Sequence, residues 1–256
     1  MTSPEKNYDI FIGDLHIRSN YSDGKSSIKE IVLGARKTGF DFISITDRNQ
    51  LDGSKYAKLL VEETGLGLIA ILGEEVSAPW GNLLALNIDE LVSPDMTPQE
   101  ICKTVHKQGG YVFASHPYWI DTREEFWEKG LFDSLLKQKD IDGFELINSE
   151  SVPPYDNLPV IQKYYSLRMQ KIFYPVIGGS GSLEAKSIGK NIRMYVLAES
   201  LTEKNILDAI LAGRCVIEWQ KKFYGEDKYF SEIDIWFRKN YIDHLQQCQE
   251  EVSKDT

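Results

Sequence analysis

The sequence predicts an α/β barrel built from repeated strand-helix units. Apolar and β-branched runs recur along the chain with helix-type patterns between them, which is typical of parallel sheets. The 256 residues suffice for one domain of this class, with a core at about residues 8–218 and a helical extension at about residues 229–252. The predicted strands are 8–15, 40–46, 67–72, 82–88, 111–114, 143–147, 173–177, 192–198 and 215–219.

Helix start and stop signals lie between several of these strands. The pair Ser26-Ser27 can cap a helix with one apolar face, and Gly39 is its stop signal. Thr97 precedes Pro98 and an acidic first turn, a combination typical of a helix N-terminus. A further helix is predicted within residues 202–213. Strands and helices therefore alternate along the predicted core.

Charge and composition exclude several classes of protein. A formal net charge of −10 would repel a phosphate backbone, so we expect no nucleic-acid partner. No apolar run reaches the ~18 residues of a membrane span, and residues 1–8 lack the features of a secretory signal, so we expect a cytoplasmic protein without a membrane partner. The wide spacing of Cys102, Cys215 and Cys248 predicts reduced, mostly buried thiols.

Polar side chains follow six of the predicted strands. Because the carboxyl ends of barrel strands meet on one face, we expect these side chains to surround a common mouth. A purely structural distribution would scatter such residues over both ends of the strands. The six segments are 14–18, 46–49, 73–75, 115–117, 148–150 and 178–181.

The same segments resemble the motifs of the PHP (polymerase and histidinol phosphatase) superfamily. The run DLHIRSNYSDG at 14–24 is similar to the first PHP motif, DLHxHSxxSDG, and SITDRNQLDG at 44–53 is similar to the second. Shorter matches follow in the family's order, namely GEEV at 73–76, GYVFASHPY at 110–118, IDGFELIN at 141–148 and VIGGSGS at 176–182. The resemblance implies a distorted (β/α)7 barrel and a phosphoric ester hydrolase that uses up to three metal ions.

Carried over by resemblance, the family's metal ligands fall on nine positions of this chain. A ligand needs a lone pair, which imidazole and carboxylate groups supply. The positions that keep such a side chain, and at which the resemblance places any metal, are His16, Asp23, Glu75 and His116. The remaining positions carry Arg18, Arg48, Asn82, Gly181 and Leu183.

The two arginines cannot replace imidazole ligands. A guanidinium group stays protonated and has no acceptor, so Arg18 and Arg48 are lost as ligands. Asn82 still offers a carbonyl oxygen, and Glu184 is a substitute carboxylate beside the last motif. The chain has four histidines in total, which are too few for an imidazole-rich three-metal site. The sequence therefore predicts a depleted metal site.

One reading of the mouth is a site for a single ion. His16, Glu75 and His116 form a set of two imidazoles and one carboxylate that can bind one divalent ion, such as Mn, Fe or Zn, and activate water for ester hydrolysis. The alternative is that no metal binds, and that the two histidines are remnants held by hydrogen bonds inside the mouth.

The other reading concerns anions. Arg18 and Arg48 can bind the phosphate or carboxylate group of a small ligand through paired hydrogen bonds. The alternative is a set of structural ion pairs with neighbouring carboxylates, for which the sequence offers Asp14, Asp23, Asp47 and Glu75.

The leading prediction is a phosphoesterase-like protein with attenuated or lost hydrolysis, which still binds a phosphate-bearing ligand. An active one-metal phosphoesterase and a non-catalytic scaffold or interaction module are the alternatives. Tyr118 and Trp119 either line a substrate pocket or pack at the rim. His106 and His244 lie in predicted helices and are interpreted as surface residues, and Glu145 is part of a PHP segment without an assigned role.

Overall fold

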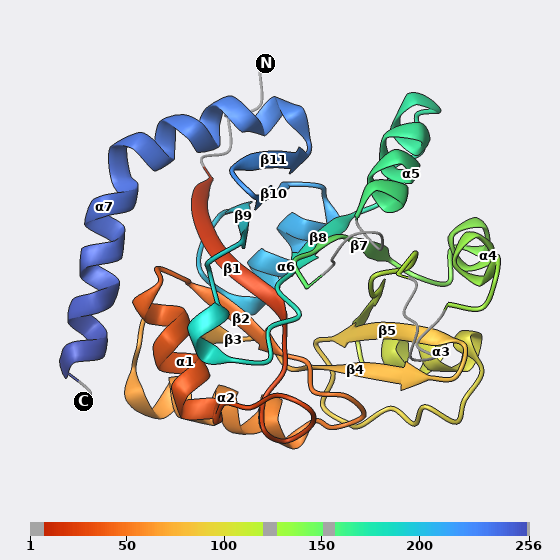
Figure 1. Ribbon diagram of the computed structural model, residues 1–256, viewed down its shortest axis with the longest axis horizontal. Helices are drawn as coiled ribbons and strands as arrows, with labels where there is room; N and C mark the ends of the chain where they lie inside the picture. The colour runs from red at the N-terminus through yellow and green to blue at the C-terminus, as the bar shows by residue number, and fades with distance from the viewer. Residues whose placement is uncertain (1–7, 120–126, 151–156, 255–256) are drawn as a thin grey trace, which may run out of the picture.

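The computed structural model describes residues 8–119, 127–150 and 157–254, which form a mixed α/β fold (Figure 1). The strands are β1 (Asp9–Ile17), β2 (Phe42–Ile45), β3 (Ile69–Ala70), β4 (Gly73–Ala78), β5 (Gly81–Leu86), β6 (Tyr111–Ala114), β7 (Gly143–Asn148), β8 (Val176–Gly179), β9 (Ile192–Ala198), β10 (Cys215–Trp219) and β11 (Lys222–Gly225). The α-helices are α1 (Ile28–Lys37), α2 (Asp52–Thr64), α3 (Pro98–Lys107), α4 (Leu131–Gln138), α5 (Leu158–Met169), α6 (Glu203–Leu211) and α7 (Phe230–Lys254).

The strands form two sheets that meet at the predicted mouth. One sheet has the order β11-β10-β9-β1-β2-β3 and the other has the order β4-β5-β6-β7-β8. Two isolated parallel bridges join them, between Ile17 and Ser182 and between Arg48 and Glu75. Both bridges involve residues beyond or near the carboxyl ends of β1 and β2. The seams between the sheets are therefore lined by the motif residues.

The sheet arrangement corrects the prediction of a purely parallel sheet. Pairing is parallel within β1-β2-β3 and within β6-β7-β8, but it is antiparallel for β4-β5, β5-β6, β1-β9 and β9-β10. Over the described residues the strands form two ladders rather than one closed ladder. The sequence also missed β4, because its buried residues Glu74 and Glu75 are charged and so resemble a polar turn.

Capping residues position the helices as predicted. Ser27 and Thr97 each accept a hydrogen bond from the backbone N–H of Glu30 and Glu100, respectively, and each glutamate side chain accepts one in return from the cap backbone. Such a capping box satisfies two backbone donors that a helix N-terminus otherwise leaves unpaired. Helix α1 therefore starts at a defined point after the loop that follows β1.

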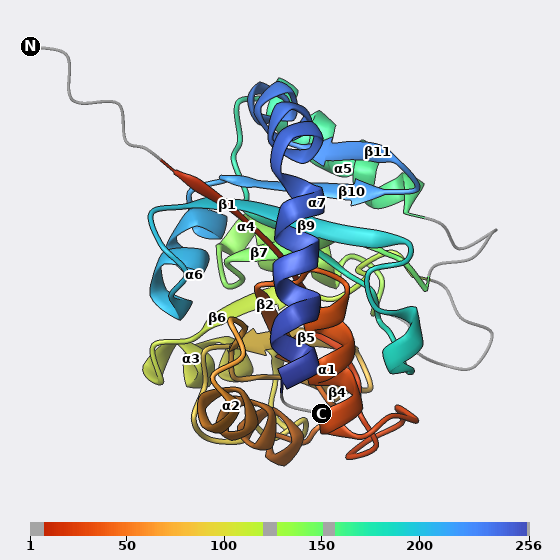
Figure 2. The ribbon, with the colours of Figure 1, turned by 90° about the vertical axis from the view of Figure 1, so that its left-hand side faces the viewer.

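Apolar residues fill the space on both sides of β1. Ile10 and Ile12 belong to a cluster that includes Ile31 of α1 and Ile233 of α7, whereas Leu15 belongs to a second cluster with residues of both sheets. Figure 2 shows α7 lying across the sheet beside α1. No helix among the described residues is long and apolar enough to cross a bilayer.

Candidate metal and anion site

Of the four predicted metal positions, Glu75 lies at the centre, with both histidines beside its carboxylate. His16 lies at the end of β1, Glu75 lies in β4, and His116 follows β6. His16 and Glu75 are fully buried, and His116 is 8% exposed. Asp23 is at the rim, with a side chain that is 42% exposed. The fold thus brings together residues that are up to 100 positions apart in the sequence.

Both oxygens of Glu75 are engaged. Oε1 has four polar neighbours: Ser115 Oγ at 3.0 Å, His116 Nε2 at 3.2 Å, Asn82 Nδ2 at 3.3 Å and His16 Nε2 at 3.5 Å. Oε2 accepts a hydrogen bond from Arg48 Nε at 3.2 Å. Oε1 of Glu75 therefore faces the two imidazole groups, and Oε2 faces the guanidinium group of Arg48.

Glu145 of β7 holds the two histidines in place. Its Oε1 lies 3.0 Å from His16 Nδ1, and its Oε2 accepts the backbone N–H of His116 at 2.9 Å. This contact leaves His16 Nε2 facing Glu75, buried and without a hydrogen-bond partner among the described residues. Metal-binding histidines are commonly oriented by such a carboxylate on their second nitrogen. The sequence marked Glu145 only as a motif residue, because its contacts are made across strands.

The charges of His16 and Glu75 depend on each other. Burial acts to lower the pKa of His16, but the neighbouring carboxylates of Glu145 and Glu75 outweigh it and raise that pKa to about 10. Burial likewise acts to raise the pKa of Glu75, and the charge of His16 together with the hydrogen bond of His116 holds that pKa well below its usual range. The two charges therefore stabilise each other, and a metal ion at Nε2 of His16 would take the place of a proton.

Arg18 lies within the mouth and binds carboxylates from two loops. Its Nη1 donates to Asp23 Oδ2 at 2.8 Å, and its Nη2 donates to Glu150 Oε2 at 2.8 Å and to the Gly181 carbonyl at 3.1 Å. The Arg18 side chain is 4% exposed, and its Nε has no hydrogen-bond partner among the described residues. Glu150 is a partner that sequence reasoning did not name.

Arg48, like Arg18, pairs with carboxylates, whereas Asp14 and Asp47 accept hydrogen bonds from other groups. Arg48 lies 3.2 Å from Glu75 Oε2 and 3.8 Å from Asp23 Oδ2. Asp47 accepts hydrogen bonds from Ser19 and Ser22, and Asp14 accepts the backbone N–H groups of His16 and Ser180. The described ion pairs of the two arginines thus involve Asp23 and Glu75, but not Asp14 or Asp47.

The last of the PHP-like segments, residues 176–182, lies beside Arg18 but has no metal-ligand side chain at that place. Gly181 has a left-handed backbone with φ of 60°, and its carbonyl accepts from Arg18. Glu184 binds Lys25 and Lys186, so its carboxylate is directed to surface amines. Asn82 presents its Nδ2 donor to Glu75, while its Oδ1 accepts from Ser77.

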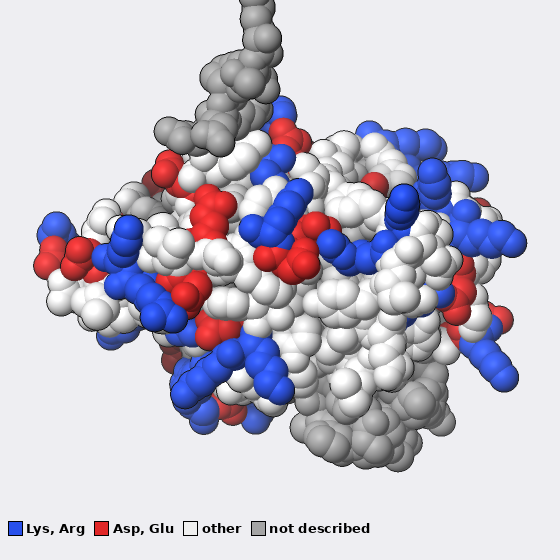
Figure 3. All heavy atoms as spheres, turned by 90° about the horizontal axis from the view of Figure 1, so that it is seen from above, with Lys and Arg blue, Asp and Glu red and all other residues white. Residues whose placement is uncertain are grey.

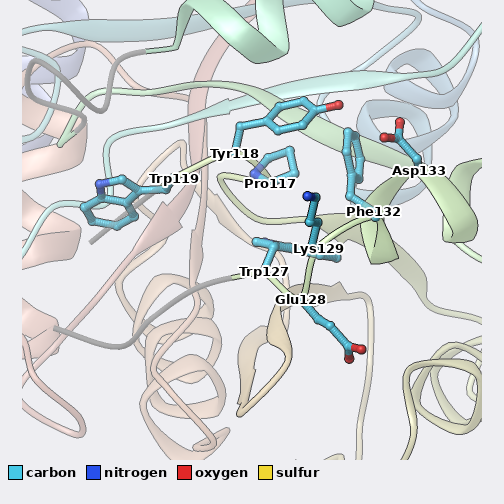
Figure 4. Close-up of a pocket in the computed structure, with 9 residues that line it drawn as sticks. Pro117, Tyr118, Trp119, Trp127, Glu128, Lys129, Phe132 and Asp133 are labelled. Carbon is cyan, nitrogen blue, oxygen red and sulfur yellow. The ribbon is translucent and has the colours of Figure 1, made fainter. Parts of the chain in front are cut away.

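An aromatic pocket of about 240 Å³ opens next to His116 (Figure 4). Tyr118 and Trp119 both line it, and the Trp119 ring meets the His116 ring edge-on with 4.6 Å between centroids. The other lining residues are Pro117, Trp127, Glu128, Lys129, Gly130, Phe132 and Asp133. The pocket and the polar mouth therefore share the His116–Trp119 contact.

The two remaining histidines differ from each other. His106 is on the surface, where it pairs with Asp142. The interpretation of His244 as a surface residue is wrong, because its side chain is 19% exposed and its Nε2 lies 2.9 Å from the Gly39 carbonyl. The packing of α7 against α1 buries it, which a helical pattern alone does not reveal. All three cysteines are buried and free.

The comparisons with known proteins agree with this arrangement. The PHP domain profile matches residues 14–152, which is more than half of the chain. MJ1587, an uncharacterized protein of Methanocaldococcus jannaschii, is 29% identical over 147 residues, which are 53% of this chain and 81% of that protein.

Two solved structures extend the likeness to the fold. One is a two-domain protein of Bacteroides vulgatus that contains a predicted PHP-like metal-dependent phosphoesterase. It has a TM-score of 0.70 and 19% identity, and the match covers 91% of this chain and 70% of that one. The other is Endonuclease Q in complex with a 27-mer duplex that has an abasic lesion at the active site. Its TM-score is 0.56 at 17% identity, and the match covers 80% of this chain and 57% of that one.

The chain belongs to the PHP domain family. Its fold is that of PHP-like metal-dependent phosphoesterases, and the residues that match the family's motifs converge at one end of its strands.

The position of Glu145 gives a testable prediction. Replacing Glu145 by Gln should lower the free energy of unfolding by about 1–3 kcal/mol, because one acceptor of a buried network becomes a donor. Urea denaturation measures the change. Glu62→Gln, on the exposed face of α2, is the control and should change stability by less than about 0.5 kcal/mol. Equal stabilities for the two variants would contradict this role of Glu145.

Proposed function

We propose that this chain is a PHP-family phosphoesterase-like protein in which hydrolysis is attenuated or lost. The observation that carries the proposal is the pairing of Arg18 and Arg48 with acidic side chains inside the mouth. Cationic side chains thereby neutralise carboxylates that would otherwise attract metal ions. We further propose that the two bridged sheets correspond to the family's distorted (β/α)7 barrel in a single domain.

The donor set would supply ligands for one ion but not for a cluster, and the ligand atoms of His16, Glu75 and His116 would have to move closer, because they do not all lie within 4.8 Å of one another. The buried, unpartnered Nε2 of His16 faces Glu75, and His116 Nε2 approaches the same oxygen. These three groups would hold the ion, with Asp23 at the rim. When bound, it would supply Lewis-acid activation of water and of a phosphoryl oxygen. Arg18 and Arg48 stand at positions where a second or third ion would need neutral imidazoles.

The one-metal phosphoesterase is therefore the second candidate. It is favoured by Glu145, which orients His16 in the manner of a metal ligand. The surrounding charge disfavours it. The ion can bind His16 only after the imidazolium loses its proton, and the carboxylates of Glu145 and Glu75 oppose that loss.

A small phosphate-bearing ligand could bind both to an attenuated protein and to a one-metal phosphoesterase. Asp23 and Glu150, the partners of Arg18, are 42% and 28% exposed and can turn toward solvent, which would free the buried guanidinium for an anion. The pocket beside Trp119 would then accept an apolar or aromatic part of the same ligand. A non-catalytic scaffold remains the third candidate.

The expectation of no nucleic-acid partner stays a prediction. Endonuclease Q binds a DNA duplex on a similar fold. On the face shown in Figure 3, however, acidic side chains lie among the basic ones, so the negative net charge is not offset by a continuous basic stripe on that face.

Restoring the replaced ligands tests the proposal directly. The combined substitutions Arg18→His, Arg48→His, Gly181→Asp and Leu183→His should increase the bound Mn, Fe or Zn by at least one equivalent per chain, because imidazole and carboxylate lone pairs replace guanidinium groups and apolar atoms. Elemental analysis of the purified protein measures this increase.

The control for that experiment carries the same four substitutions together with His116→Ala, which removes a retained ligand and should reduce the gain. Aspartate is a suitable replacement at Gly181, because it tolerates a left-handed backbone better than most residues. Metal content equal to that of the unmodified chain would contradict the proposed ligand positions.

Turnover distinguishes the first two candidates. With Mn, Fe or Zn supplied, we expect the wild-type chain to hydrolyse p-nitrophenyl phosphate at a rate within about threefold of that of the His116→Ala variant. The reason is that binding of an ion in the mouth is disfavoured. A wild-type rate tenfold or more above that variant would favour the one-metal phosphoesterase instead.

Inorganic phosphate tests the anion site. If phosphate binds at the arginines, millimolar concentrations should raise the melting temperature by about 2–4 °C, as expected for ~1 kcal/mol of stabilisation. The shift should disappear in Arg18→Gln and persist in Arg238→Gln, a change on the exposed side of α7. An equal shift in both variants, or no shift in the wild type, would exclude this site.

A further inference from the structure

A second group of metal-ligand side chains lies at the opposite end of β2 from the mouth. Asp41 immediately precedes β2, whereas Arg48 lies beyond its carboxyl end. The four residues of β2 span about 13 Å, so this group is separate from the mouth. The other two members, His244 and Cys248, lie one turn apart on α7 and therefore share a helix face.

The three side chains have the geometry of a zinc site. His244 Nε2 lies 3.5 Å from Asp41 Oδ1 and 3.6 Å from Cys248 Sγ. Zinc bonds of about 2.0 Å to N or O and about 2.3 Å to S, arranged tetrahedrally, separate neighbouring ligand atoms by about 3.3–3.6 Å. Among the residues that the structure describes, this is the one trio of His, Cys, Asp or Glu whose ligand atoms all lie within 4.8 Å of one another.

Burial makes the group suitable for a structural ion. The side chain of Asp41 is 6% exposed, Cys248 is fully buried, and His244 is 19% exposed, which leaves one side open for entry. Zinc takes four ligands, and a water molecule entering from the exposed side of His244 would supply the fourth. The Gly39 carbonyl, 2.9 Å from His244 Nε2, is a hydrogen-bond partner of the metal-free imidazole.

We propose that Asp41, His244 and Cys248 bind one transition-metal ion of the zinc class, which fastens α7 to the start of β2. His244 and Cys248 come from the C-terminal helix and Asp41 comes from the core, so the ion would bridge elements about 200 residues apart in sequence. The site is independent of the mouth and of any hydrolysis there.

The surrounding charges favour a divalent ion. Arg36 donates to Asp41 at 3.0 Å and to Glu251 at 2.7 Å. With a neutral thiol and a neutral imidazole, these three charged groups carry a net charge of −1. A divalent ion together with the thiolate of Cys248 brings the net charge to zero. Asp41 Oδ1 keeps a second lone pair for the ion while it accepts from Arg36.

Metal binding exchanges protons in a defined way. Burial raises the pKa of the Cys248 thiol to about 11, so the metal-free thiol is protonated. On binding, the thiol proton is released to solvent and the S–M bond forms. If His244 Nε2 carries the proton that bonds Gly39, that proton moves to Nδ1, which leaves the Nε2 lone pair for the ion. No oxidant or reductant takes part.

Cobalt(II) tests the site, because it occupies zinc sites and gives a near-ultraviolet thiolate charge-transfer band. We expect the full-length, chelator-treated chain to bind one equivalent of Co²⁺ with this band, and Zn²⁺ to displace the cobalt. His116→Ala should retain the band, because the mouth contains no cysteine. The band therefore separates this site from the proposed hydrolase site.

Variants identify the ligands. Cys248→Ser and Cys248→Ala should lose the band, and His244→Ala should weaken cobalt binding at least tenfold. Cys102→Ala and Cys215→Ala, which remove the other buried thiols, are the matched controls and should retain the band. No thiolate band in the wild-type chain, or a full band in folded Cys248→Ser, would overturn the proposal.

Discussion

The carboxylate of Glu75 sets the main constraint on this molecule. It is fully buried between two sheets, and an uncompensated charge at such a place costs several kcal/mol. The chain compensates it with its own cations, Arg48 on one oxygen and His16 near the other. The same two residues, Arg48 and Glu75, also form an isolated backbone bridge that joins the sheets.

The same principle operates on the other side of the mouth. Arg18 is almost fully buried and binds Asp23, Glu150 and the Gly181 carbonyl, which come from three separate loops. A guanidinium group can organise such loops because its donors spread in one plane. The positive charge on this side of the mouth is thus built into the covalent chain, and a guanidinium group has no lone pair for a metal ion.

β2 has polar groups at both of its ends. Arg48, beyond its carboxyl end, belongs to the mouth, while Asp41, before its first residue, accepts hydrogen bonds from the Ile12 backbone and from Arg36. All four residues of the strand are buried, so packed core separates the two polar groups.

Local patterns in the sequence determined the helix caps, the strands 111–114, 192–198 and 215–219, and the presence of two guanidinium groups, those of Arg18 and Arg48, within the motifs. These follow from backbone and side-chain chemistry that acts within a few residues. Only the tertiary structure decided which carboxylates the arginines bind, that Glu145 orients His16, and that β4 is a buried strand although it contains Glu74 and Glu75. It also placed His244 beside Asp41. The reason is that the charge of a buried group is set by neighbours from distant segments, and sequence spacing contains no record of those distances.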